Sequence, residues 1–183
     1  MTLEPSPSGS SVAATPIAVR LVASEELASQ VAVILPQVFA RIAAILSGLE
    51  VHHVGATAIA GALTKGDLDV VLRVDAARFA AATELLRTRF QVKQPENWDP
   101  YFASFGCDTE FALPVGVQLV VKDSEADFFL FIRDYLATHP ETLARYNRVK
   151  REHAHRGPDE YWAAKDRVLR WVLDQRPKLS TSH

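Results

Sequence analysis

Residues 55–72 read GATAIAGALTKGDLDVVL, and this stretch is the most informative part of the chain. Gly55 begins a tight turn, and Asp67 and Asp69 then alternate with apolar residues in a strand-like run. Side chains two apart on a strand point to the same face, so the two carboxylates converge while the residues between them face the core. Mg²⁺ is often held by one or two carboxylates plus phosphate oxygens, and an upstream loop of glycine and hydroxyl residues can bind those phosphates. The stretch therefore predicts nucleotide chemistry.

The composition is that of a globular protein of ordinary charge. The chain has 183 residues, of which 48% are hydrophobic, and its formal net charge is −2. This charge argues against a general affinity for nucleic acid, and the length suits one domain with a substantial core. Cys107 is the only cysteine, which excludes an internal disulfide and is typical of a reducing compartment. We therefore expect a cytoplasmic protein.

The ends of the chain differ from its middle. Residues 1–16 are rich in Ser, Pro, Thr and Gly and predict a disordered tail without signal-peptide features. We expect a single domain over residues 17–175 and a flexible end over residues 176–183. No membrane span is expected, because the apolar run 31–46 is interrupted by Pro36, Gln37 and Arg41.

Before residue 90 the pattern alternates between strands and helices. A helix is expected from Ser24 to about Ser47, kinked or broken into two by Pro36, and Asp75 is expected to cap another that runs to about Arg89. Strands are expected at Ile17–Val22, Val51–Val54 and Asp67–Val74.

The second half predicts a small antiparallel meander followed by three helices. The strands expected in the meander are Tyr101–Phe105, Thr109–Leu113 and Val117–Val121, with a turn at Pro114–Gly116. From Asp127 onward the chain is expected to be helical, with breaks at His139-Pro140 and Gly157-Pro158, because proline disfavours the helical conformation in the residue before it. The fold class is therefore α+β, with helices packed over a mixed sheet and a helical C-terminal segment.

Two separated blocks carry a resemblance to a known family. The first block runs from His53 through Gly55 and Gly61 to Lys65 and Asp69, and is similar to the pattern HxGSTxxPGLxxKxxxD. The second block contains Phe131-Ile132-Arg133-Asp134-Tyr135-Leu136, His139-Pro140-Glu141, Tyr146-Asn147, Lys150, Tyr161 and Lys165. On these blocks the chain resembles the GrpB family, a branch of the nucleotidyltransferase-like fold named for DNA polymerase β.

The resemblance implies a site as well as a fold. It implies transfer of a nucleoside monophosphate from a nucleoside triphosphate to a small-molecule acceptor, with Mg²⁺ on Asp67 and Asp69 as the catalytic pair. The residues expected to contact the nucleotide are Gly55, Ala56, Thr57, Lys65, Arg133 and Lys150. Two departures stand in the first block, where Ala56 replaces the usual Ser or Gly and Ala60 replaces a common Pro.

A third carboxylate, which generally activates the nucleophile in such transferases, is not evident. The later strand reads Val117-Gln118-Leu119, so Gln118 offers only a neutral oxygen there. Glu110 or Asp108, in the strand expected before it, are the candidates for the missing acid. Two-metal phosphoryl transfer needs oxygen ligands for both the attacking and the leaving oxygen. The alternative function is therefore a non-catalytic nucleotide-binding or interaction module on the same fold.

Other chemistries are disfavoured. His52-His53 on a strand point to opposite faces, and His153 and His155 on a helix do not share a face, so neither pair predicts a zinc site. Neither Gly-x-Ser-x-Gly nor GxxxxGK[ST] occurs in the chain, which removes the signatures of a serine hydrolase and of a standard phosphate-loop kinase. Trp162 is expected to pack in the core, and stacking on a nucleobase is its alternative role.

Overall fold

A five-stranded mixed sheet forms the centre of the molecule. The computed structural model describes residues 18–177. The sheet order is β2-β4-β7-β6-β5, and its strands are β2 (Glu50–Val54), β4 (Leu68–Val74), β5 (Gln91–Lys93), β6 (Phe102–Cys107) and β7 (Val115–Val121). β4 and β7 are parallel, whereas the other three pairings are antiparallel. A separate antiparallel pair joins β1 (Val22–Ala23) to β3 (Leu63–Thr64).

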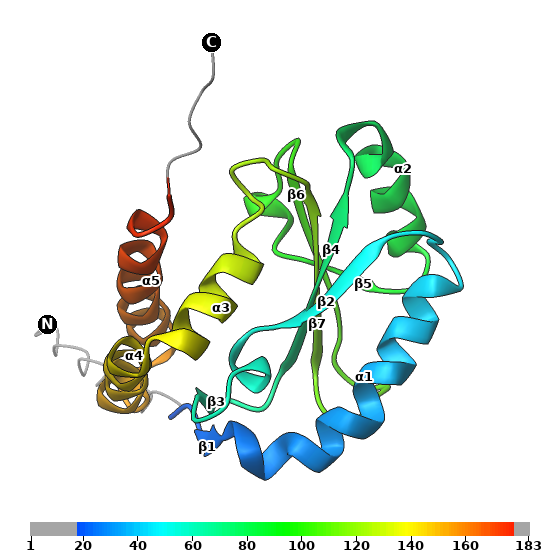
Figure 1. The fold of residues 1–183 in the computed structure, drawn as a ribbon. Helices are drawn as coiled ribbons and strands as arrows, with labels where there is room; N and C mark the ends of the chain where they lie inside the picture. Colours follow the sequence, from blue (N-terminus) through cyan, green and yellow to red (C-terminus); the bar gives the residue numbers. More distant parts are fainter. Residues whose placement is uncertain (1–17, 178–183) are drawn as a thin grey trace, which may run out of the picture.

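Helices cover both faces of this sheet, as Figure 1 shows. The helices are α1 (Ala28–Ala43), α2 (Ala76–Arg87), α3 (Phe129–Thr138), α4 (Pro140–His153) and α5 (Pro158–Asp174), with short 3₁₀ turns η1 (Ser24–Leu27), η2 (Ala56–Ala58) and η3 (Pro95–Asn97). α1 and α2 lie against one face, α3 lies beside the other, and α4 and α5 pack with α3. The α+β class, the mixed sheet and the helical C-terminal segment are confirmed.

Alternation along β4 separates a core face from a pocket face. Leu68, Val70 and Leu72 are fully buried in the main hydrophobic core, together with Val38 and Ile42 of α1. Strand side chains alternate between faces, so Asp69 and Val71 point to the opposite face, toward α3. This is the arrangement predicted for Leu68, Val70 and Asp69.

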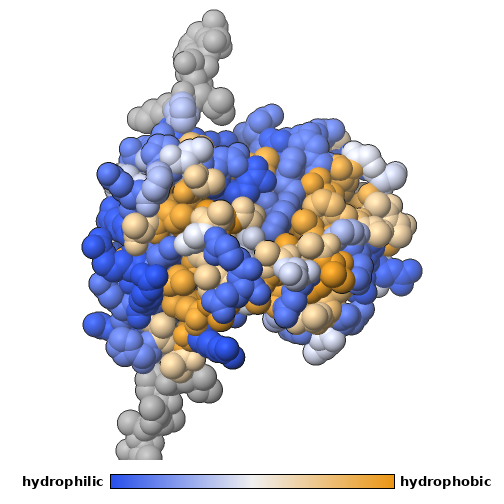
Figure 2. All heavy atoms as spheres, turned by 60° about the horizontal axis from the view of Figure 1, so that its bottom comes forward, coloured by the Kyte–Doolittle hydropathy of each residue, from blue (hydrophilic) through white to orange (hydrophobic). Residues whose placement is uncertain are grey.

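Of the two outcomes expected at Pro36, a kink or a break into two helices, the break does not occur. Its residues run as one helix from Ala28 to Ala43 with Pro36 inside it. Pro36 is exposed, so water can satisfy the carbonyl that loses its hydrogen bond to the proline, and the helix does not break. The run Ser24–Ala43 is long and apolar enough, by length and composition alone, to cross a membrane. The inner side chains of α1 pack on the sheet. On its outer side Val33 is 62% exposed. Figure 2 shows hydrophobic residues at the surface of the molecule.

Three sequence-based predictions of local structure are wrong. Thr109–Leu113 is a loop, in which Leu113 is buried and Phe111 packs against the core, so the apolar pattern reflects anchoring of a loop. Val115 and Gly116 belong to β7 and not to a turn. The strand expected at Ile17–Val22 begins at a residue outside the described part of the chain, and over residues 18–23 only Val22–Ala23 is a strand, paired with the two residues of β3.

The breaks expected in the C-terminal half are confirmed. α3 ends at Thr138, before His139-Pro140, and α5 begins at Pro158, directly after Gly157. The expected tail over residues 1–16 lies outside the described residues, as do residues 178–183 of the expected flexible end.

Candidate functional site

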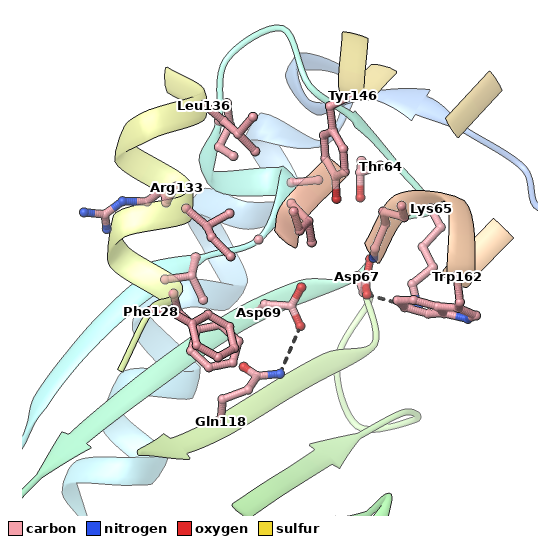
Figure 3. Close-up of a pocket in the computed structure, with 18 of the residues that line it drawn as sticks. Thr64, Lys65, Asp67, Asp69, Gln118, Phe128, Arg133, Leu136, Tyr146 and Trp162 are labelled. Atoms are coloured by element: carbon pink, nitrogen blue, oxygen red, sulfur yellow. Dashed lines mark hydrogen bonds and ion pairs between the residues drawn. The ribbon is translucent and has the colours of Figure 1, made fainter. Parts of the chain in front are cut away.

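A cavity of about 310 Å³ lies between the sheet and the C-terminal helices. Its walls come from the β2–η2 turn, from β4, β6 and β7, and from α3, α4 and α5. Both predicted carboxylates line it, as do Gly55, Ala56, Lys65, Arg133 and Lys150 (Figure 3). The fold thus brings together residues from the two blocks of sequence that carry the family resemblance.

Two glycines make room for the carboxylate of Asp69. Gly55, directly after β2, has φ of 71°, a conformation that favours glycine. A Cβ on Gly55 would overlap one carboxylate oxygen of Asp69, and a Cβ on Gly116 of β7 would overlap the other. The absence of both side chains therefore allows Asp69 to extend into the cavity.

The Asp69 carboxyl is held in an unfavourable environment for a charge. Burial and, secondarily, the Asp67 carboxylate raise the pKa of Asp69 to about 7, although Lys165 and Lys65 act in the opposite direction. Gln118 Nε2 donates a long hydrogen bond of 3.5 Å to Asp69 Oδ1. Perturbed carboxyl groups in clefts are typical of functional sites.

Asp67 lies one residue before β4 and forms an ion pair in the pocket. Its Oδ2 is 3.1 Å from Lys65 Nζ, and Lys65 also lies over the ring of Trp162 at 5.0 Å. Trp162 is 46% exposed at the mouth of the cavity, whereas packing in the core was expected. Tyr161, its neighbour, is buried in the helical layer.

Two lysines from the C-terminal helices complete the basic side of the pocket. Lys150 is 2% exposed, its Nζ donates to the carbonyl of Leu63, and burial with the nearby charge of Lys165 lowers its pKa to about 7. Burial likewise lowers the pKa of Lys165 to about 8, against the attraction of Asp67 and Asp69. Lys165 was not among the predicted site residues. It could have been included, because it belongs to the second family-like block, four residues after Tyr161.

Arg133 and Thr57 are placed differently from the expectation. The Arg133 side chain lines the cavity, but its Nη1 donates to the carbonyl of His53 at 3.0 Å and its guanidinium points away from the other labelled residues in Figure 3. The Thr57 hydroxyl donates to the carbonyl of Asp67 at 3.3 Å and lies 3.0 Å from His53 Nε2. Thr57 thus joins the turn to the start of β4 instead of lining the cavity.

Neither candidate for a third acid reaches the pocket. Glu110 forms an ion pair with Arg41 at 2.7 Å, and Asp108 forms one with Lys93. On the adjacent strand β7, Gly116 pairs with Asp69, and the polar side chain that reaches Asp69 is that of Gln118, two residues further along. Within residues 18–177 no group of three His, Cys, Asp or Glu side chains could hold a metal ion.

The donor set suits one hard cation that takes further ligands from a substrate. Asp67 and Asp69 supply carboxylate oxygens, and a divalent charge between them would offset both the burial and the mutual repulsion that raise the pKa of Asp69. Mg²⁺ is commonly bound by one or two carboxylates together with water and substrate phosphates. A second ion would lack a third carboxylate in the described part of the chain.

Comparison with known proteins identifies relatives over most of the chain. The family profile described as GrpB protein matches residues 25–175. A UPF0157 protein of Vibrio cholerae is 32% identical over 135 residues, which cover 73% of this chain and 71% of the relative. A UPF0157 protein of Pseudomonas aeruginosa is 30% identical over 154 residues, which cover 78% of this chain but only 61% of that protein.

A solved structure shares the fold at low sequence identity. GrpB from Enterococcus faecalis has a TM-score of 0.64 and 16% identity, covering 85% of this chain and 98% of that one. The Cid1 poly(U) polymerase, in a structure with MgGTP bound, has a TM-score of 0.49 and 13% identity, and the match covers 69% of this chain and 41% of that polymerase. The similarity to GrpB from Enterococcus faecalis shows the fold alone.

Proposed function

This chain belongs to the GrpB family, and from its pocket we propose that it binds a nucleoside triphosphate with one Mg²⁺ and transfers the nucleoside monophosphate to an acceptor. One observation carries the proposal. Two carboxylates at the start of β4 share a cavity with three lysines, of which two come from helices more than 80 residues further along the chain. Opposite charges collected in one cleft suit a ligand that brings both a cation and phosphates.

Each charged group then has a distinct task. Asp67 and Asp69 would hold Mg²⁺, which when bound supplies positive charge to the phosphate oxygens. Lys65 and Lys165 would neutralise the triphosphate, because both lie beside the two carboxylates without being tied to backbone groups. Gly55 and Ala56 let the phosphates approach the backbone closely, since neither carries a bulky side chain.

The proposed reaction is an in-line displacement. The acceptor oxygen forms a bond to the α-phosphorus while the bond from that phosphorus to the oxygen bridging to the β-phosphorus breaks. Pyrophosphate leaves with the bonding electrons, and the proton of the acceptor hydroxyl passes to water. The lysines contribute by stabilising the negative charge that accumulates on the leaving phosphates.

A second candidate function follows from Gln118. This residue stands beside Asp69, where a third carboxylate would activate an acceptor, and a neutral amide cannot remove a proton. A module that binds the triphosphate without turning it over would be consistent with that residue. The two functions differ in whether a product forms.

Binding and turnover can be tested separately. Titration calorimetry with ATP, GTP, CTP and UTP should show binding of at least one triphosphate that strengthens on addition of Mg²⁺. Asp69→Asn should weaken the Mg²⁺-dependent binding by at least about tenfold, equivalent to about 1.4 kcal/mol. Asp108→Asn is the matched control, because Asp108 lies outside the pocket and should leave the affinity unchanged.

Product formation then separates the candidates. Pyrophosphate release from α-labelled triphosphate in the presence of candidate acceptors, lost in Asp69→Asn, supports the transferase. Binding without release supports the module. Absence of Mg²⁺-dependent binding for all four triphosphates would refute both.

A further inference from the structure

The cavity has two chemically different ends, which lie on opposite sides of Asp69. Figure 3 shows Lys65, Asp67 and Trp162 on one side and Gln118 and Phe128 on the other. The second end is lined by Gln94, Phe102, Ser104, Gln118, Phe128 and Phe129. None of these side chains carries a charge, so this end does not suit a phosphate.

Charged residues close to this uncharged end are engaged elsewhere. The Arg133 guanidinium is directed to the carbonyl of His53, and Lys93 forms an ion pair with Asp108. Arg73, on the same face of the sheet, is paired with Asp127 at 2.7 Å. These charged groups are therefore not available to pair with a charged ligand. Burial of such a ligand at this end would remove its hydration without replacing it.

Gln118 presents an unmet hydrogen-bond acceptor at this end. Its Nε2 is directed to Asp69, and its Oε1 is buried without a hydrogen-bond partner in the described part of the chain. The reverse orientation of the amide would place its oxygen against a carboxylate oxygen, so the observed orientation is the favourable one. In Figure 3 this oxygen lies on the side of Phe128. Buried polar atoms are normally paired, and a ligand O–H or N–H would satisfy this one.

The neighbouring hydroxyl does not compete for this role. Ser104 Oγ donates to the carbonyl of Lys93 and accepts from Trp98 Nε1 at 3.3 Å, so its hydrogen bonds are already made within the protein. Gln118 Oε1 is therefore the acceptor that a ligand would meet.

Three phenylalanines form an apolar wall of stacked rings beside Gln118. The rings of Phe128 and Phe129 are stacked with centroids 4.5 Å apart, and those of Phe102 and Phe129 are stacked at 6.2 Å. All three rings are partly exposed, and all three line the cavity. Such a wall favours a planar apolar body, because aromatic rings gain from offset stacking in addition to burial.

We propose that this end of the cavity is the acceptor site and that it takes an uncharged molecule with a flat ring and a hydroxyl donor. The ring packs on Phe128 and Phe102, and the hydroxyl donates to Gln118 Oε1 next to Asp69. The role of this end as an acceptor site rests on the proposed function, whereas the binding of an uncharged ring with a hydroxyl donor does not depend on it.

Three matched probes test the proposal by ligand-observed fluorine NMR. 3-Fluorobenzyl alcohol is uncharged and has the donor, 3-fluoroanisole is uncharged without it, and 3-fluorobenzoate is an anion. We expect the alcohol to bind about tenfold more tightly than the ether, the factor given by about one neutral hydrogen bond, and the benzoate not to bind. Equal or tighter binding of the benzoate, or no binding of the alcohol, would overturn the proposal.

Variants assign the binding to the named side chains. Gln118→Met should equalise the alcohol and the ether, because it keeps the length of the side chain and removes the oxygen. Phe128→Ala should weaken both by several-fold, whereas Tyr101→Ala, which removes an exposed ring outside the cavity, should weaken neither. A preference for the alcohol that persists in Gln118→Met would contradict the role of Oε1.

Competition distinguishes this proposal from the proposed function. The alcohol and a Mg²⁺–triphosphate should bind together, so saturating triphosphate should leave the alcohol signal in place. Displacement of the alcohol by triphosphate would refute the assignment as an acceptor site and indicate a place for the nucleobase. Binding of the alcohol by a protein that binds no triphosphate would refute the proposed function and retain the site.

Discussion

The charged form of Asp69 lowers the free energy of unfolding, because its carboxylate is buried. Its pKa is raised to about 7, chiefly by burial, whereas an unfolded chain ionises its aspartates near 3.9. The folded state therefore binds more protons than the unfolded state between about pH 4 and 7, so this group lowers stability as pH rises through that window and its full cost is present above pH 7. Asp69→Asn should raise the stability at pH 8 by up to about 4 kcal/mol, and the gain should shrink toward pH 5.

Thermal unfolding at pH 5 and pH 8 measures this effect. Asp108→Asn serves as the control, because Asp108 is 52% exposed and its removal should shift the melting temperature by the same small amount at both values. If Asp69→Asn lowered the melting temperature equally at pH 5 and pH 8, Asp69 would be a structural carboxylate.

Some of the individual site residues can be predicted from the sequence, and others cannot. The alternation of Asp67 and Asp69 with apolar residues, and the glycine before them, are local patterns, so both carboxylates and Gly55 could be predicted to share the pocket. The family resemblance singled out Gln118 as standing where a third acid was expected, but the contact of Gly116 with Asp69 arises from the parallel pairing of β4 with β7, which no local pattern specifies. The direction of the Arg133 guanidinium is likewise set by a carbonyl of another element.

Asn147 of helix α4 helps to hold the segment before the acidic strand. Asn147 Oδ1 accepts from the N–H of Leu63 at 2.8 Å, and its Nδ2 donates to the carbonyl of Gly61 at 2.7 Å. Asn147 is only 7% exposed, so water cannot readily replace it. Asn147→Ala would leave two backbone groups without partners and should destabilise the protein by about 2 kcal/mol, which is about 4–8 °C in melting temperature for a chain of this size.

Because this segment leads to Lys65 and Asp67, the same variant should also weaken triphosphate binding. Asn97→Ala, at an exposed asparagine of η3, is the matched control and should change stability by less than about 0.5 kcal/mol. A melting temperature for Asn147→Ala equal to that of the wild type would show that these hydrogen bonds contribute nothing net.

Helix ends are the elements most readily predicted here, and the meander is the least. Proline and glycine act on their own neighbours, so the breaks at His139-Pro140 and Gly157-Pro158 follow from the sequence alone. The residues Thr109–Leu113 resemble a strand because Leu113 and Phe111 are apolar, but they serve to anchor a loop on the core. Similarly, Pro36 was expected to kink α1 or to break it into two helices, and only the tertiary structure shows that Pro36 lies on the solvent side of one continuous helix.

For the whole molecule, the pocket is a junction between two layers with separate cores. One core joins the sheet to α1 and α2, and another joins α3, α4 and α5 to the segment around Ile59. The carboxylates belong to the sheet, whereas Lys150 and Lys165 belong to the helical layer. A ligand that contacts both groups of charges therefore links the two layers.

Hydrogen exchange should detect this link. Mg²⁺ with a bound triphosphate should slow amide exchange in residues 55–68 and in residues 161–169 together, because local opening of either layer would break contacts to the ligand. α2 lies on the opposite face of the sheet and should exchange at an unchanged rate. Omission of Mg²⁺, or the substitution Asp69→Asn, should remove the protection from both segments. Protection confined to residues 55–68 would mean that the ligand contacts the sheet layer alone, and the charged groups of α4 and α5 would then have no part in binding it.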